Sequence, residues 1–267
     1  MKIYHYTTIR TLALILKSKK IRFNRLDRVD DMEESIYGSG PFQTKLGQYT
    51  FVSCWTKSPK ENLALWNMYT RYKGVRIALD EMPFITYKIN GNVSLFPNKI
   101  RLGEDYFDSV FNNKAELYDV NYIEDPKTEI EKLIIPTDNG GILIPLERIG
   151  TFKRKEWSIQ QESRFKITFL PADIQGIMKQ GVNTPQDFLQ KAFESIGQSI
   201  AINKPITTPY IDIDLDPTKL ADIEILMGPL TDEADRFIVE SLLKPFQIRS
   251  NAIQNSIFLG KLRDKIF

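Results

Sequence analysis

The sequence predicts a single α+β domain in which short mixed or antiparallel strands alternate with a few helices. Strand-like and helix-like stretches are interspersed along the whole chain, no change of composition marks a linker, and no segment repeats with a period of about 20–50 residues. Several short strands with only a few helices favour this class over a doubly wound parallel sheet. With 267 residues, 42% of them hydrophobic, the chain (residues 1–267) can bury a substantial core as one domain.

Strands are expected where β-branched and aromatic residues cluster between turn residues. In chain order they are Lys2–Tyr6, Ile21–Phe23, Thr50–Thr56, Val75–Leu79, Leu117–Ile123, Ile159–Phe169, Tyr210–Leu215 and Ile223–Met227, with a further short stretch at Phe246–Ile248.

Helices are expected where apolar residues recur at helical spacing behind a capping residue. Thr7 or Thr8 can cap the first helix, which runs to about Ser18, because Ile9, Leu12 and Leu16 share an apolar face. The others are Glu61–Tyr72, which ends before Gly74, Pro185–Ala201, in which Phe188, Phe193 and Ile196 can share a face, and Thr231–Leu243.

Three segments lack a clear pattern. Residues 83–116 and 125–150 are predicted to be insertions or long loops. The closing stretch Ser256–Phe267 alternates apolar and basic residues, so an edge strand, a short helix and a dimer contact all remain open for it.

Composition narrows the classes of function. The chain has 36 basic and 34 acidic residues, so its net charge gives no overall attraction to nucleic acid or membranes. Its longest apolar run, Leu12–Leu16, is far shorter than the roughly 20 residues of a membrane span, and the N-terminus lacks a signal-peptide pattern. One cysteine and one histidine exclude a disulfide framework and a Cys/His zinc cluster. We therefore expect a cytoplasmic protein with no membrane partner.

The single histidine and the single cysteine are the first candidates for chemistry. His5 lies in the first strand between two tyrosines, just before the start of a helix, and a lone histidine is most often structural. Cys54 lies in an apolar strand and is expected to be a buried thiol. A Cys/His dyad would need these two side chains to meet.

Two groups of acidic residues are candidates for a metal site. Asp212, Asp214 and Asp216 alternate along a predicted strand, which places them on one face. We favour a solvent-facing strand edge whose last aspartate caps a turn or helix over a divalent-cation site. The patch Asp30–Glu34 follows three arginines and by itself predicts a loop with surface ion pairs.

A row of polar residues on a late strand is more informative. On a strand over Ile159–Phe169, Gln160, Glu162 and Arg164 point to one face, while Ile159, Phe165 and Ile167 help to fill the other. A Gln/Glu/Arg row is costly to bury and needs a reason if it faces inward; the sequence leaves both orientations open.

These pieces together resemble the bacterial family called domain of unknown function 2971, nearly end to end. Three motifs match the family pattern: Tyr4-His5-Tyr6-Thr7, the block of Phe51–Trp55, Leu65–Tyr69 and Gly74–Asp80, and Ile225–Pro229. Two others match with differences. The acidic turn Val29–Glu33 lacks the family's Asn and Pro, and the element Trp157, Gln160, Glu162 and Arg164 has Gln in place of the first Glu. The activity of that family is not established, so this resemblance implies no reaction.

A second similarity, to the three-motif core of ADP-ribosyltransferases, does imply one. It rests on His5-Tyr6-Thr7 entering a helix, Ser53 on a middle strand and Gln160-x-Glu162 on a late strand. The resemblance implies that NAD is the substrate, that His5 orients its ribose, that Glu162 stabilises the transition state and that Gln160 positions an acceptor. The further ligand contacts that it implies are Tyr6, Thr7, Arg22, Ser53, Trp55, Trp66, Tyr69 and Arg164.

The residue types suit that chemistry. Breaking the nicotinamide–ribose bond creates a cation that a fixed carboxylate stabilises. Residues 1–28 hold eight Lys and Arg and the start of a helix, both of which can bind a pyrophosphate. Trp66 and Tyr69 lie three apart on a predicted helix, where they can pack on a flat ring or belong to the core.

Three functions follow, in order of preference. The first is a bacterial ADP-ribosyltransferase-like enzyme that transfers or hydrolyses the ADP-ribose of NAD, with an unknown acceptor; proteins of this type often act as toxins or in phage defence. The second is a non-catalytic nucleotide or nucleic-acid binding module that uses the basic residues Arg22, Arg25, Arg28, Arg71, Lys73 and Arg76. The third is a metal-dependent hydrolase or nuclease built on the acidic groups at 30–33 and 212–216.

Overall fold

The fold was analysed on a computed structural model, which describes residues 1–37, 43–89, 91–95, 106–108, 114–133, 135–136, 142–246, 248 and 252–263. Its helices are α1 (Ile9–Ser18), α2 (Leu63–Thr70), α3 (Pro126–Glu131), α4 (Ile174–Lys179), α5 (Pro185–Ala201), α6 (Pro217–Ala221) and α7 (Glu233–Leu243). Short 3-10 helices are η1 (Leu26–Arg28), η2 (Met32–Ser35), η4 (Leu46–Tyr49), η5 (Leu146–Arg148), η6 (Lys155–Gln160) and η7 (Lys244–Phe246).

Most of the strands belong to one sheet. They are β1 (Lys2–Thr7), β2 (Lys20–Arg25), β3 (Thr50–Thr56), β4 (Val75–Asp80), β7 (Tyr106–Asp108), β8 (Leu117–Asp119), β13 (Glu162–Pro171), β14 (Tyr210–Asp214), β15 (Glu224–Met227) and β16 (Ile253–Asn255). The order is β14-β2-β3-β1-β4-β15-β16, and β13 pairs with β3, β7 and β8. These pairs are antiparallel except β15 with β16, so the predicted α+β class with a mixed sheet is confirmed.

The remaining strands form small pairs outside this sheet. They are β5 (Tyr87–Ile89) with β6 (Asn92–Ser94), β9 (Asn121–Ile123) with β12 (Phe152–Arg154), and β10 (Ile135–Pro136) with β11 (Ile142–Leu143).

The sheet divides at β3. One edge of β3 pairs with β13 over its whole length, from Thr50 to Thr56. On the other edge, β2 pairs only at Phe51 and Val52, and β1 pairs only at Thr56. The strands β1 and β2, which α1 connects, therefore separate beside residues 53–55 and leave a fork in the sheet.

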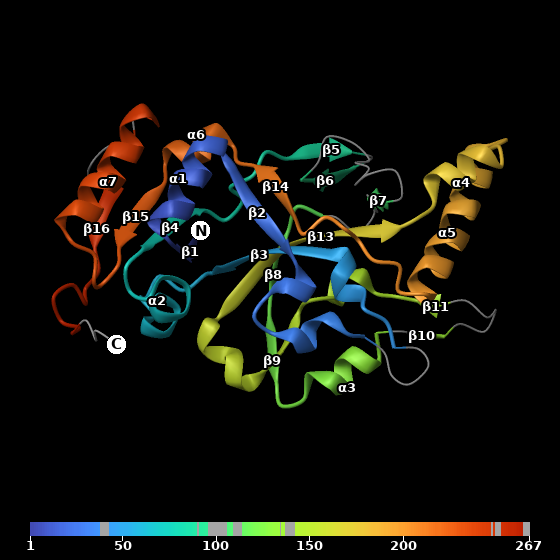
Figure 1. Cartoon of the computed structure of the whole chain (residues 1–267), viewed down its shortest axis with the longest axis horizontal. Helices are drawn as coiled ribbons and strands as arrows, with labels where there is room; N and C mark the ends of the chain where they lie inside the picture. The colour runs from blue at the N-terminus through green and yellow to red at the C-terminus, as the bar shows by residue number, and fades with distance from the viewer. Residues whose placement is uncertain are drawn as a thin grey trace.

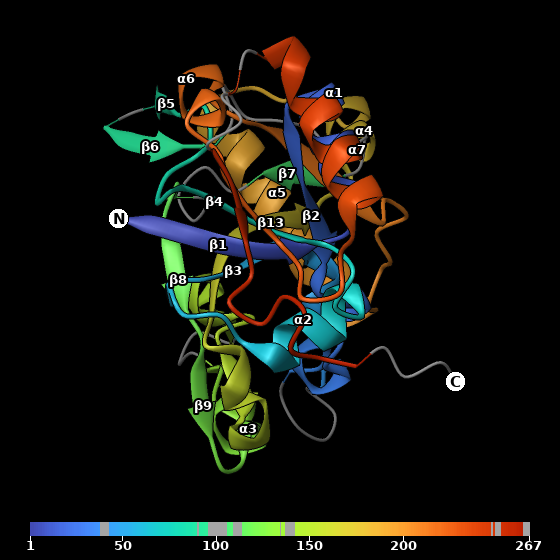
Figure 2. The same ribbon diagram turned by 90° about the vertical axis from the view of Figure 1, so that its left-hand side faces the viewer.

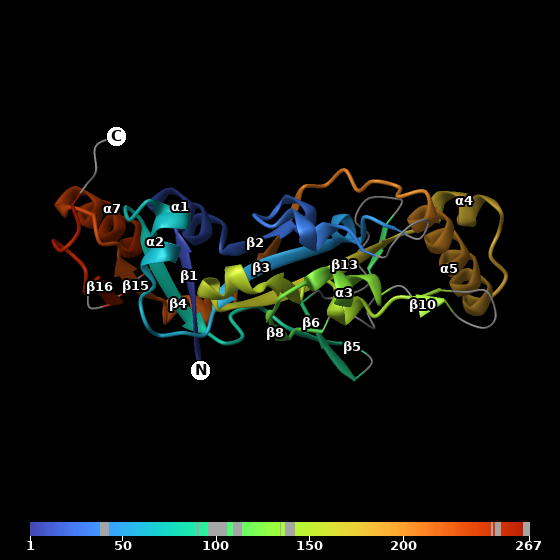
Figure 3. The ribbon, with the colours of Figure 1, turned by 90° about the horizontal axis from the view of Figure 1, so that it is seen from below.

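Helices cover one face of this sheet and extend the molecule at both ends. In Figures 2 and 3, α1, α2 and α7 lie on one side of the sheet, and the β5–β6 hairpin lies on the other. Figure 1 shows α4 and α5 at one end of the long axis and α7 with β16 at the other. None of the helices in the described ranges is long and apolar enough to cross a membrane.

One continuous core joins most of these elements, with members from Ile3 in β1 to Ile253 in β16, and a second small cluster of Tyr6, Leu65 and Trp66 packs α2 against β1. The Thr8 hydroxyl accepts from the Thr11 amide and caps α1, as predicted, and Leu12 and Leu16 of that helix are buried. In α5 the buried face holds Ala192, Ile196, Ser199 and Ile200, so the expected place of Phe193 on it is wrong: its side chain is 59% exposed.

Several expected boundaries also change. The stretch Leu117–Ile123 is two strands, β8 and β9, rather than one. The stretch near Phe246 is the 3-10 helix η7, and residues 256–263 form turns rather than an edge strand or helix. The expected long loops at 83–116 and 125–150 contain short elements where they are described, although much of each lies outside the described residues.

Candidate functional site

A cavity of about 320 Å³ lies in the fork between β1 and β2, and we call it the fork cavity. Its walls come from β1, β2, β3 and β13, the start of α1, the end of η1 and the turn that follows it, with one residue each from α2 and β12. The lining residues are His5, Tyr6, Thr7, Thr8, Thr11, Arg22, Asn24, Arg28, Val29, Asp30, Val52, Ser53, Cys54, Tyr69, Lys153, Glu162 and Arg164. The split register of the sheet thus brings together residues that are distant in the sequence.

A smaller cavity of about 50 Å³ adjoins it. Tyr4, Trp55, Thr56, Leu65 and Gln160 line only this smaller space. His5, Tyr6, Cys54, Tyr69 and Glu162 line both cavities. Of the three residues predicted for catalysis, His5 and Glu162 therefore stand at the junction of the two spaces, and Gln160 lines the smaller one.

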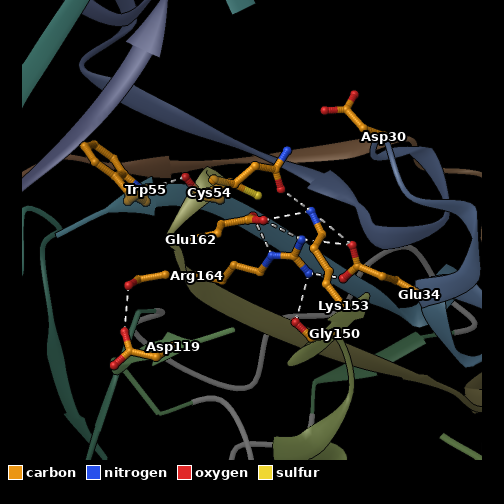
Figure 4. Close-up of polar contacts among 12 residues, drawn as sticks. Asp30, Glu34, Cys54, Trp55, Asp119, Gly150, Lys153, Glu162 and Arg164 are labelled. Atoms are coloured by element: carbon orange, nitrogen blue, oxygen red, sulfur yellow. Dashed lines mark hydrogen bonds and ion pairs between the residues drawn. The ribbon is translucent and has the colours of Figure 1, made fainter. Parts of the chain in front are cut away.

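Four charged side chains form a buried network at the base of the fork cavity: Glu34, Lys153, Glu162 and Arg164. Figure 4 shows the Arg164 guanidinium between the two carboxylates, with Lys153 beside them. The Arg164 Nε lies 2.6 Å from Glu162 Oε1, and the Lys153 Nζ lies 2.8 Å from Glu162 Oε2. None of these side chains is more than 6% exposed. Two acids and two bases balance, which is how such a cluster becomes tolerable in the interior.

Arg164 uses all of its hydrogen-bond donors within the protein. Nε and Nη2 donate to Glu162, Nη1 and Nη2 donate to Glu34, and Nη1 also donates to the Gly150 carbonyl. A guanidinium has five N–H groups, so none remains for a phosphate. Arg164 was predicted to contact the ligand, but the geometry fits it to holding Glu162 in place.

Glu162 is kept ionised by this network. Burial raises the pKa of its carboxyl, but the charges of Arg164 and Lys153 outweigh burial and lower that pKa to about 2. The backbone fixes the same residue: its amide donates to the Tyr122 hydroxyl at 2.8 Å. Glu162 is thus a rigid carboxylate that carries its charge at any ordinary pH.

The row that contains Glu162 is partly different from the one expected. The strand begins at Glu162, because η6 occupies Lys155–Gln160 and Gln161 adopts a left-handed conformation with φ 44°. Ile159 therefore does not fill the apolar face of the strand and is 52% exposed. From Glu162 onward the polar row faces inward, and Phe165 and Ile167 fill the other face as predicted.

Gln160 still joins the site, but through a different contact. Its side chain is buried, its Oε1 accepts from Lys153 at 2.8 Å, and its Nε2 lies 3.4 Å from the Tyr69 hydroxyl. It touches the same ammonium as Glu162 and helps to position it. Nothing in this arrangement directs Gln160 toward an external acceptor.

His5 is held in one tautomer. Its Nδ1 lies 2.9 Å from the Cys54 carbonyl oxygen, a backbone group that the fork leaves without a strand partner. A carbonyl only accepts, so Nδ1 carries the proton and Nε2 keeps a free lone pair. Burial lowers the pKa of His5, and the hydrogen bond to Cys54 opposes this only in part. His5 is therefore neutral near pH 7.

The aromatic residues divide between core and cavity. Trp66 is fully buried, packs edge-on against Tyr6 at 4.8 Å and donates to Glu61, so it belongs to the core. Tyr69, one turn later on α2, is 39% exposed and lines both cavities. Trp55 is buried and packs on the His5 ring at 5.2 Å.

Cys54 and His5 do come together, but not as a dyad. Cys54 lines both cavities, and burial raises the pKa of its thiol. The contact of His5 is with the Cys54 backbone carbonyl rather than with the sulfur. The residue is only partly buried rather than fully buried as expected, but a thiol that resists ionisation is a poor nucleophile.

Thr7, Ser53 and Arg22, three further residues predicted to contact the ligand, line the fork cavity, but they differ in how free their side chains are to bind it. Thr7 is largely buried, and the Ser53 hydroxyl accepts from Trp55 Nε1 at 3.0 Å. Arg22 makes two hydrogen bonds to Asp212, at 3.0 and 3.2 Å, and stacks on the Tyr210 ring at 3.4 Å. Its charge is already neutralised, which disfavours the predicted role in ligand binding.

The acidic groups do not form a metal site. Asp212 and Asp214 pair with Arg22 and Lys20 at the surface, and Asp216 caps α6, as the preferred interpretation predicted. Across the part of the chain that the structure describes, no three His, Cys, Asp or Glu side chains gather in a way that could hold a metal ion.

Sequence reasoning missed two members of the buried network. Glu34 belongs to the patch that was expected to form surface ion pairs; its neighbour Glu33 does so with Arg154, but Glu34 is only 1% exposed. Lys153 lies in β12, within a segment with no strand prediction. The alternation Phe152, Lys153, Arg154 is too short to show which residue faces inward.

A glycine completes the network. The Gly150 carbonyl accepts from Arg164 and its amide donates to the buried Tyr37 hydroxyl at 2.8 Å. Gly150 has φ +70°, and an added Cβ would lie 3.0 Å from Leu26 Cδ2. Residues 146–150, expected to be part of a long loop, are thus built into the site.

No family model matches this chain, and no curated protein or solved structure matches it either. The resemblances that its motifs suggest therefore stand as predictions.

Proposed function

We propose that the protein is an ADP-ribosyltransferase-like enzyme of the bacterial cytoplasm that binds NAD in the fork cavity and cleaves its nicotinamide–ribose bond. One observation carries the proposal: a neutral, fixed His5 and an ionised, fixed Glu162 line the same junction between a large and a small cavity. A cavity of this size is within the usual range for small-molecule ligands.

The chemistry needs a fixed negative charge next to the ribose. When the bond between C1′ and the nicotinamide nitrogen breaks, its electron pair leaves with neutral nicotinamide and positive charge develops on the ribose. The Glu162 carboxylate stabilises that charge, and it needs no reorganisation because Arg164 and Tyr122 already hold it in place. Water or an acceptor then forms the new bond to C1′ and loses a proton.

His5 and the aromatic residues would orient the substrate. The free Nε2 of His5 accepts a hydrogen bond from a ribose hydroxyl, because Nδ1 is committed to the Cys54 carbonyl. Tyr69 and Trp55 supply the flat apolar surfaces of the smaller cavity, where the nicotinamide ring binds.

The test is nicotinamide release by the purified protein and by Glu162→Gln, which keeps the size of the side chain and an acceptor oxygen for the network. Removing the charge should lower the rate by about 100-fold or more. NAD affinity should change little, because the effect falls on the transition state. Glu33→Gln, which changes a neighbouring exposed carboxylate, is the control. Equal rates in Glu162→Gln and wild type would refute the assignment.

A second function is favoured because the carboxylate oxygens of Glu162 already accept hydrogen bonds within the protein. Its two oxygens already accept from Arg164 and Lys153, and Cys54 lies against them, which leaves little capacity for a ribose hydroxyl. This favours a non-catalytic nucleotide-binding module. Such a module would bind NAD with a strong dependence on salt and release no nicotinamide.

A further inference from the structure

We propose that Arg28 binds the diphosphate of a nucleotide ligand in the fork cavity. The inference rests on the proposed function only in its placement of a nucleotide there; it holds equally for a nucleotide that is bound and not cleaved. Four cations line the cavity, Arg22, Arg28, Lys153 and Arg164, and their contacts differ.

Three of these four are already engaged with carboxylates. Arg164 has no free N–H group, and Lys153 donates to Glu162 and Gln160 within the buried network. Arg22 is bound through Nε and Nη2 to Asp212. Drawing any of them to a phosphate would uncover a carboxylate, which for Lys153 and Arg164 would be a buried one.

Arg28 differs from all of them. It is exposed, and it has no hydrogen-bond or ion-pair partner among the residues that the structure describes. The nearest acid in the sequence, Asp27, is occupied: Arg25 donates to both of its oxygens, at 2.6 and 2.9 Å. The charge of Arg28 is therefore available to a ligand.

The position of Arg28 is fixed although its side chain is free. It ends η1, whose first residue, Leu26, is fully buried in the core. The Arg25–Asp27 pair and a hydrogen bond from Arg25 to the Ile206 carbonyl hold the same turn. A guanidinium on an ordered turn loses less entropy on binding, and its planar fork suits two phosphate oxygens.

One carboxylate limits the ligand class. Asp30 lines the cavity two residues further on and has no cation partner among the described residues; it accepts from the Tyr69 hydroxyl at 3.4 Å. In Figure 4 it stands apart from the buried network. It repels a bare anion but accepts from hydroxyl groups, so a diphosphate ester that carries a sugar fits this cavity better than inorganic pyrophosphate does.

The experiment measures the binding of ADP, adenosine and inorganic pyrophosphate by calorimetry to wild type, Arg28→Gln and Arg10→Gln. Arg10 is the matched control: it is an exposed arginine of the same basic segment, on α1, and lines neither cavity. We expect Arg28→Gln to weaken ADP binding about 10- to 100-fold, the effect of losing a charge-assisted hydrogen bond. Adenosine binding should stay the same in all three proteins, and pyrophosphate should bind wild type more weakly than ADP.

Three results would overturn the proposal. These are unchanged ADP affinity in Arg28→Gln, equal losses for ADP and adenosine, and an equal loss in Arg10→Gln. The test is independent of catalysis. Arg28-dependent ADP binding without nicotinamide release would refute the enzyme and keep this site, whereas nicotinamide release that Arg28→Gln leaves unchanged would do the reverse.

Discussion

Two strands of this protein carry alternating charged residues, and the structure treats them in opposite ways. On β14, Asp212 and Asp214 point to solvent and pair with Arg22 and Lys20 of the neighbouring strand. On β13, Glu162 and Arg164 are buried and pair with Glu34 and Lys153 from elsewhere in the chain. In both strands charged residues alternate with uncharged ones, so this alternation determines only which residues share a face of the strand, not whether that face is buried.

What covers the face decides the rest. The β14 row is satisfied by its neighbouring strand and by water, and exposed pairs of this kind contribute about 0–1 kcal/mol each. The β13 row is covered by η2, β12 and the segment before β12, whose own charges and carbonyls complete it. In that environment each charge depends on its partners, because an unpaired ion in the interior is very costly.

The largest expected effect comes from breaking the buried row at Glu34. Glu34→Ala should lower the free energy of unfolding by about 3–5 kcal/mol, because it leaves Arg164 and Lys153 with an excess of buried positive charge. Urea denaturation measures this. Glu33→Ala, which removes an exposed partner of Arg154, should cost less than about 1 kcal/mol. Similar losses in the two variants would contradict the comparison.

The contrast between Glu33 and Glu34 also shows which features of the structure the sequence can predict and which it cannot. Local patterns predicted β3, α1 and α5 closely, because spacing and caps are local properties. Glu33 and Glu34 are adjacent residues of the same type, however, and only the path of the chain in three dimensions determines that Glu34 is buried. The fork likewise depends on which strand pairs with each half of β3, which no local pattern encodes.

Short motifs in the sequence can single out candidate site residues, but they cannot show the contacts with distant residues that determine what each one does. His5, Glu162 and Tyr69, which the motifs single out, all line the cavities, and their roles stay predictions. Arg22 also lines the fork cavity, but Asp212, 190 residues away, neutralises its charge, which no local pattern shows. Gln160 lies outside the strand because Gln161 has a left-handed backbone conformation, which the surrounding sequence does not predict.

A second, intermediate effect is expected in acid. The pKa of Glu162 in the folded protein, about 2, is below its ordinary value of 4.5. Its contribution to stability is therefore complete above about pH 4.5 and is lost as the pH falls toward 2. Across that interval, wild type should lose more stability than Glu162→Gln, as followed by thermal unfolding at each pH. Parallel curves would mean that the carboxyl is not held by its cations.

The smallest effect is expected on the exposed row. Asp212→Asn should lower the free energy of unfolding by less than about 1 kcal/mol, because the Arg22–Asp212 pair is solvated. Raising the salt concentration to 1 M should remove most of the difference from wild type, since the Debye length then falls to about 3 Å. A loss as large as that of Glu34→Ala would show that the two rows do not differ in kind.

The Arg164–Glu34 bond joins residues that are 130 positions apart in the chain. At about 5–20 residues per second, a ribosome needs roughly 6–26 s to add that length of chain. Until Lys153 and then Arg164 have been made, Glu34 has no cationic partner, and Glu162 is still absent from the base of the fork cavity. The buried network, and with it the base of the fork cavity, can therefore be completed only when the second half of the chain has emerged and folded onto the first.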